Sequence, residues 1–93
     1  MRHLLLAAVA VLFAGPALAD DKCMVTDPSG TPLNVRSEPG GKILTTLSNG
    51  VTVMIGETRK DAKGREWAVI TSPLNGDPKA KGGWVAKDLV SCF

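Results

Sequence analysis

The chain has 93 residues, of which 22% are charged, and a formal net charge of +2. This length leaves room for one small domain. So weak a net charge offers no electrostatic basis for wrapping nucleic acid or an anionic membrane surface, and we expect neither as a partner.

Residues 1–19 are predicted to be a secretory signal peptide. A short basic start precedes an apolar run from Leu4 to Ala14, and Ala17-Leu18-Ala19 supplies the small residues of a cleavage site. The run is much shorter than the roughly 20 residues that cross a bilayer, which favours cleavage over a retained anchor. We therefore expect the mature domain to be residues 20–93. It would be exported, to the periplasm or the extracellular space, without membrane insertion.

Cys23 and Cys92 are the only cysteines, and they lie near the two ends of the mature domain. Exported thiols oxidise, and small domains often need a covalent constraint. The sequence therefore predicts a Cys23–Cys92 disulfide, worth about 4 kcal/mol in the chain-entropy model. Two free thiols or an intermolecular bridge are the alternatives. Two thiolates without histidine cannot complete a zinc shell, so no metal is expected.

The first half of the mature chain is punctuated like β-structure. A short strand is expected at 23–26, followed by a turn at 27–30 in which Pro28 and Gly30 favour type I. Leu33 and Val35 then point to one face of an extended segment. Periodicity at 43–47 fits a strand or one helical turn, and its threonines favour the strand.

The second half begins with the clearest strand, from Val51 to Ile55, which Gly56 is predicted to end. The segment 57–65 is interpreted as a charged loop, and 66–71 as the next strand. The segment 72–82, with two prolines and two glycines, is predicted to be a long irregular connection. The remaining expectations are a strand at 83–86, a tight turn at 87–89 and a last strand at 90–93 beside the first.

Five or six short strands with frequent turns, and no amphipathic helix after residue 20, predict a small all-β barrel. The order of four sequence elements resembles the bacterial SH3 (SH3b) family over nearly all of the mature chain. They are Leu33-Asn34-Val35-Arg36-Ser37 with Pro39, the stretch 47–53, Trp67, and Gly83-Trp84-Val85.

The SH3b resemblance implies a small SH3-like barrel that acts as a non-catalytic exported module. Many relatives bind cell-wall peptidoglycan or its peptides, often tethered to a hydrolase. Two features depart from that family: we expect this domain to stand alone, and its connection at 72–82 is longer. Trp67 also matches the groove tryptophan of eukaryotic SH3 domains. The chain has no tyrosine, however, so recognition of polyproline ligands is not expected.

Trp67 and Trp84 are the main candidate binding residues. Strand alternation places Ala68 and Ile70 on one face and Trp67 on the other, so the indoles are expected at the outer face or rim, half exposed. The alternative is that both tryptophans form a satellite of the core. Four basic residues are expected to flank the same groove and to pair with carboxylates: Arg59, Lys60, Lys63 and Arg65. The alternative is a solvated loop.

Asn34, Arg36 and Ser37 are assigned structural roles in preference to ligand contact. Catalysis has no support, because the mature chain lacks histidine and shows no nucleophile motif or phosphate-binding glycine loop, and no cofactor is expected. The sequence thus predicts an exported binding module for a peptidoglycan peptide or an envelope protein. The alternative is a small structural or regulatory envelope protein that docks to, or inhibits, one protein partner.

Overall fold

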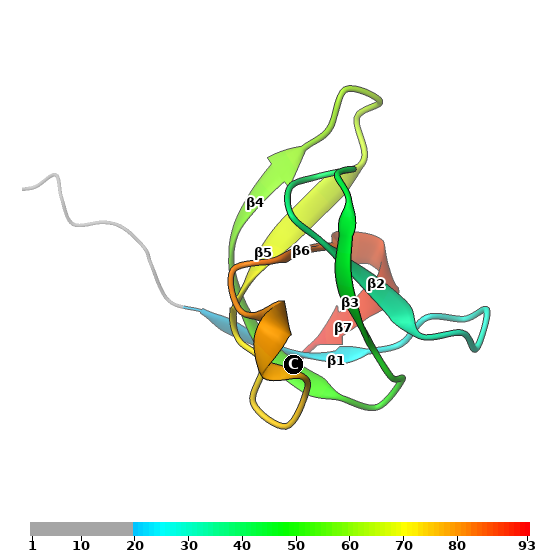
Figure 1. Ribbon diagram of the computed structural model, residues 1–93, viewed down its shortest axis with the longest axis vertical. Coiled ribbons are helices and arrows are strands. Elements are labelled where there is room, and N and C mark those ends of the chain that lie inside the picture. The colour runs from blue at the N-terminus through cyan, green and yellow to red at the C-terminus, as the bar shows by residue number, and fades with distance from the viewer. Residues whose placement is uncertain (1–19) are drawn as a thin grey trace, which may run out of the picture.

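The computed structural model describes residues 20–93, and the predicted signal peptide lies outside the described residues. Seven antiparallel strands form one sheet that curls into a barrel-like shape (Figure 1). They are β1 (Asp21–Val25), β2 (Leu33–Arg36), β3 (Ile43–Leu47), β4 (Thr52–Lys60), β5 (Glu66–Ser72), β6 (Trp84–Ala86) and β7 (Val90–Cys92).

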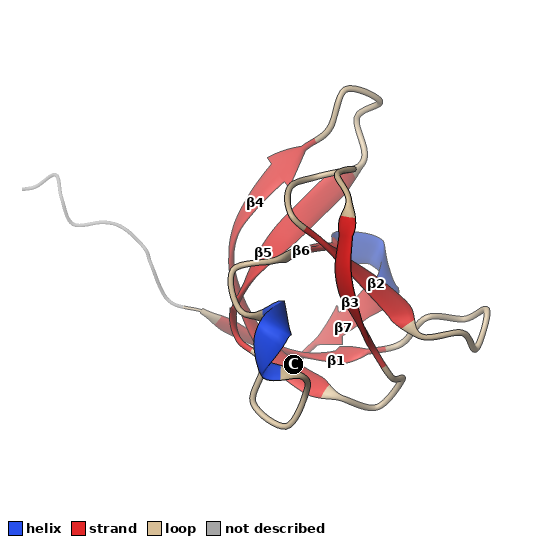
Figure 2. Cartoon of the chain, in the orientation of Figure 1, coloured by secondary structure: helices blue, strands red, loops and turns tan. Residues whose placement is uncertain are grey.

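The predicted small all-β fold is confirmed, with seven strands instead of five or six. The strand order is β3-β2-β6-β5-β4-β1-β7, so β3 and β7 are edges and the sheet is not closed. Two short 3₁₀ helices lie between successive strands: η1 (Pro78–Ala80) follows β5, and η2 (Lys87–Leu89) follows β6 (Figure 2). Within residues 20–93, no helix has the length and apolar character needed to span a bilayer.

The two ends of the described chain lie side by side, as predicted. β7 pairs with β1 in an antiparallel register that places Cys23 opposite Cys92. Their Cα atoms are 3.9 Å apart, and a disulfide joins the two side chains. The expected bond is therefore present, and neither thiol is free.

The predicted end of the central strand at Gly56 is wrong. β4 continues through Gly56 to Lys60, and its register against β5 shifts between Ile55 and Thr58. A Cβ on Gly56 would lie 2.9 Å from Cγ2 of Thr71, so the glycine permits close approach at a β-bulge instead of stopping the strand. The first part of the expected charged loop is consequently strand, which brings Arg59 onto the sheet.

Apolar residues from all seven strands fill the core. Ile55, Ile70, Val35, Val53 and Val85 are among the largest fully buried side chains. The core therefore brings together residues that lie far apart in the sequence. On β5, Ala68 and Ile70 enter this core, which leaves Trp67 on the opposite face.

The long connection after β5 is irregular, as predicted, and packs beside the β3 edge. Its Asp77 caps η1 by accepting a hydrogen bond from the Lys79 backbone N–H at 2.9 Å. Thr45 on β3 donates its hydroxyl to the other Asp77 oxygen at 2.6 Å. The connection therefore covers part of an edge strand that would otherwise be open.

Candidate functional site

Trp67 and Trp84 lie on neighbouring strands, on the face of the sheet that points away from the core. The register pairs Trp67 of β5 with Ala86 of β6, and Val69 with Trp84. These four residues and Leu89 of η2 form a second apolar cluster, called here the tryptophan cluster. The outward position predicted from strand alternation is confirmed.

The tryptophans are more buried than expected. Trp67 is 6% exposed and Trp84 is 7% exposed, so neither is the half-exposed indole that the sequence suggested. The alternative interpretation, a satellite of the core, describes their burial correctly. Trp67 nevertheless borders a pocket, and Trp84 does not.

Three arginine side chains cover the indoles. Arg59 lies with its guanidinium carbon 4.8 Å from the centroid of the Trp84 ring. Arg65 and Arg36 lie 5.6 and 6.0 Å from the centroid of the Trp67 ring. These distances fit cation–π contacts, and the aliphatic stems of the arginines shield the rings from water.

The sheet register explains which arginine reaches which indole. Arg59 is directly opposite Trp67 on β4, and Arg36 is directly opposite Trp84 through the β2–β6 pairing. Each of these long side chains extends past its cross-strand partner to the tryptophan one strand further on, so each guanidinium lies over the other tryptophan. The arrangement depends on β4 continuing past Gly56.

Asp61 orients the Trp67 indole from the hairpin between β4 and β5. Its Oδ2 accepts the indole N–H at 2.9 Å, and its Oδ1 accepts the backbone N–H groups of Lys63 and Arg65 at 2.9 and 3.0 Å. The Trp67 hydrogen bond, followed by those two backbone N–H groups, lowers the pKa of Asp61 below its ordinary value of 3.8. Asp61 thus fixes both the turn and the ring.

Asparagine at position 61 is expected to destabilise the fold at neutral pH and much less in acid. Folding lowers the pKa of Asp61, so its carboxylate contributes stability above 3.8, and that contribution disappears as pH falls through the lowered folded value. Urea unfolding of the native chain and Asp61→Asn, from about pH 7 to about pH 2, checks this. A stability difference that does not change with pH would contradict the role of the charge.

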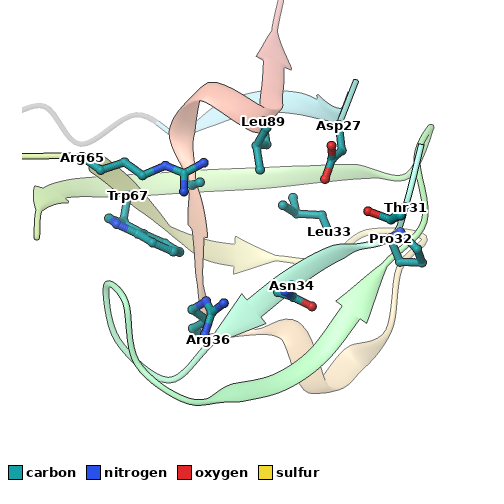
Figure 3. A pocket seen from close by; sticks show the side chains of 10 residues that line it. Asp27, Thr31, Pro32, Leu33, Asn34, Arg36, Arg65, Trp67 and Leu89 are labelled. Atoms are coloured by element: carbon teal, nitrogen blue, oxygen red, sulfur yellow. The ribbon is translucent and has the colours of Figure 1, made fainter. Parts of the chain in front are cut away.

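A pocket of about 130 Å³ opens beside Trp67 (Figure 3). Its lining comes from β2, β5, β6 and η2, from the β1–β2 loop and from the β4–β5 hairpin. The lining residues are Asp27, Thr31, Pro32, Leu33, Asn34, Arg36, Arg65, Trp67, Ala86 and Leu89. Drug-sized ligands usually occupy roughly 300–1,000 Å³, so this pocket fits one side chain or chain end.

Two guanidinium groups border the pocket with different partners. Arg65 Nη2 lies 3.2 Å from Oδ1 of the exposed Asp88. Arg36 is half-buried, and its Nη1 donates to the backbone carbonyl of Gly41 at 2.7 Å. Among the described residues no carboxylate lies within ion-pair distance of Arg36. Its charge is therefore available to an anionic ligand group.

The structure brings together only some of the predicted site residues. Trp67 and Arg65 line the pocket. Trp84 and Arg59 pack against each other and do not line it, and Arg59 also pairs with Glu57 at 3.2 Å. Lys60 and Lys63 are exposed and do not line it.

Asn34 and Arg36, expected to be structural, line the pocket, whereas Ser37 does not. The sequence analysis missed Asp27 and Asp61 altogether. For Asp61 the spacing Asp61-Ala62-Lys63-Gly64 was a usable signal, because aspartate first and glycine fourth favour a type I turn. Gly64 has a φ of +87°, the left-handed conformation that follows a type I turn in many hairpin loops and that glycine adopts without strain. Nothing local to Asp27 indicates that it borders a pocket with Arg65.

Groups of three or more potential metal ligands are absent from residues 20–93. Comparison with models of known protein families, with curated proteins and with solved structures gives no match for the chain.

Proposed function

We propose that the chain is an exported, non-catalytic binding module of the SH3b type that recognises a peptide of cell-wall peptidoglycan. The observation that carries the proposal is the pocket beside Trp67, where an apolar ring, two guanidinium groups and an amide border one small opening. Apolar surface with a few convergent polar groups is typical of ligand sites.

The polar groups around the pocket suit a peptide. Among residues 20–93, the half-buried side-chain amide of Asn34 makes no hydrogen bond, so it can pair with a peptide N–H or C=O. Arg36 and Arg65 suit a carboxylate, which guanidinium groups bind with paired hydrogen bonds. Stem peptides of peptidoglycan carry both kinds of group.

Hydrogen bonds hold the β1–β2 loop, which forms one wall of the pocket. Oδ1 of Asp27 accepts from the Ser29 backbone N–H at 2.9 Å and from its hydroxyl at 2.7 Å. Asn49 holds the same loop through the Asp27 backbone N–H and the Thr31 carbonyl, at 2.6 and 3.3 Å. Preformed walls lower the ordering cost of binding.

Two features support export. The Cys23–Cys92 disulfide is of the kind that persists in oxidising compartments. The sequence before residue 20 has the composition of a cleavable signal. Together they support a binding surface outside the cytoplasm, where peptidoglycan is found.

The native domain is expected to sediment with purified peptidoglycan, and removing both pocket cations should weaken this at least about tenfold. The test variant is Arg36→Gln/Arg65→Gln. The matched control is Lys60→Gln/Lys63→Gln, which removes the same charge from exposed residues outside the pocket. Equal retention of the two variants would argue against the pocket, and no sedimentation of the native domain would argue against wall recognition.

A second candidate function is docking to one envelope protein. Ile43 and Leu44 on the edge strand β3 are 50% and 42% exposed, and exposed apolar residues on an edge strand favour strand-to-strand protein contact. Recovery of a stoichiometric protein partner that Ile43→Thr/Leu44→Thr loses, without sedimentation on the wall, would favour this function over the first.

A further inference from the structure

The charges that border the pocket fall into two groups of opposite sign. Arg36 and Arg65 flank Trp67 at one side, and Asp27 lies at the other with Thr31 beside it. Leu33 and Leu89 lie between the two groups (Figure 3). The pocket is therefore polarised, with a cationic side, an apolar middle and an anionic side.

The Asp27 carboxylate is ionised at neutral pH, and one of its two oxygens accepts no hydrogen bond from the described residues. Hydrogen bonds from the Ser29 hydroxyl and backbone N–H lower its pKa, and the Arg65 charge lowers it further. Both Ser29 bonds go to Oδ1, and among the described residues Oδ2 accepts no hydrogen bond. One carboxylate oxygen is thus available at the pocket wall.

Asp27 and the pocket arginines do not neutralise each other. No ion pair links Asp27 to either arginine within residues 20–93, although the Arg65 charge influences Asp27. Opposite charges held apart across a small pocket suit a ligand with the reverse polarity. Such a ligand pairs with the arginines and with Asp27 at once, whereas a simple anion would be repelled by the Asp27 carboxylate.

We propose that the pocket recognises a zwitterionic amino-acid or dipeptide group. Its carboxylate would lie between Arg36 and Arg65 beside Trp67, and its ammonium would lie at Asp27. The proposal rests on the proposed peptide-binding function and names the ligand chemistry more closely. The volume of about 130 Å³ agrees, because it accommodates one residue or a small part of a second.

The test compares alanyl-alanine with two blocked forms, N-acetyl-alanyl-alanine and alanyl-alanine amide, by NMR titration of the folded native domain. Each blocked form removes one of the two ligand charges. We expect both to bind at least about fivefold more weakly than alanyl-alanine, because hydrogen bonds to charged groups contribute most among polar contacts. Equal affinity for all three peptides would overturn the proposal.

Two variants, Asp27→Asn and Arg65→Gln, test which side of the pocket binds each charge of the ligand. Asp27→Asn keeps the oxygen that accepts from Ser29, so the loop is expected to survive. It should lose affinity for alanyl-alanine and leave N-acetyl-alanyl-alanine unchanged. Arg65→Gln, at an exposed position, should do the converse with the amide form. Lys63→Gln is the control and should change none of the three affinities.

The outcomes separate this inference from the proposed function. Sedimentation with peptidoglycan without preference for the free termini would remove the zwitterion and keep the binding module. Discrimination between the peptides that Asp27→Asn does not alter would remove Asp27 from the site and overturn the proposal. Absence of both sedimentation and peptide binding would reject the proposed function together with it.

Discussion

Truncating Trp67 to alanine is expected to lower the free energy of unfolding by about 3–5 kcal/mol. Trp67 is 6% exposed and packs in the tryptophan cluster, so its removal leaves a cavity on the sheet. It also leaves Arg36 and Arg65 without the ring they cover, and Asp61 without its indole donor. For a small domain this is a large part of the total stability.

Urea unfolding followed by far-UV circular dichroism measures the loss. Trp67→Phe is the matched variant, because it keeps most of the apolar volume and removes only the indole N–H and part of the ring. Leu44→Ala, at a residue 42% exposed, is the control for truncation at the surface. A loss at Trp67 no larger than that at Leu44 would mean that the tryptophan cluster contributes little.

Because Trp67 is buried, its substitution is a poor test of ligand binding. The sequence favoured a half-exposed ring, whereas removal of a buried ring makes loss of binding and loss of folding hard to separate. The pocket arginines are better probes, because Arg65 is exposed and Arg36 is half-buried.

Opening the Cys23–Cys92 bond is expected to destabilise the native state by about 4 kcal/mol. The bond joins residues 69 positions apart and encloses nearly the whole described chain, so it restricts the unfolded ensemble strongly. It also links β7, a strand of only three residues, covalently to β1. Reduced chain is therefore expected to unfold at much lower urea concentration.

Urea titrations compare the oxidised protein, the reduced protein and Cys23→Ala/Cys92→Ala. They separate the restriction of the unfolded chain from the stabilisation of β7 against β1. If the bond acts on the unfolded chain, opening it exposes more surface on unfolding, and the slope of free energy against urea should increase. Reoxidation of the reduced sample is the control for irreversible damage. A loss below about 1 kcal/mol with an unchanged slope would show that the bond is not a major constraint.

Local chemistry in the sequence was sufficient for most of the fold. Alternation placed Ala68 and Ile70 in the core and Trp67 outside, because successive strand residues must face opposite sides. Two cysteines near the ends of the mature domain predicted the disulfide, and a last strand at 90–93 was expected beside the first. The strand end predicted at Gly56 was wrong, because a glycine in a strand can mark either an end or a bulge, and only the packing against Thr71 distinguishes them.

The amino-acid sequence by itself determined the all-β class, the outward face of the tryptophans and the covalent closure of the chain. These follow from strand periodicity and from the small number of cysteines. Only the tertiary structure decided how deeply the tryptophans are buried and which charges border the pocket. The covering arginines come from β2, β4 and the β4–β5 hairpin, and Asp27 lies 38 positions before Arg65. Such contacts depend on strand order and register, which local sequence patterns do not encode.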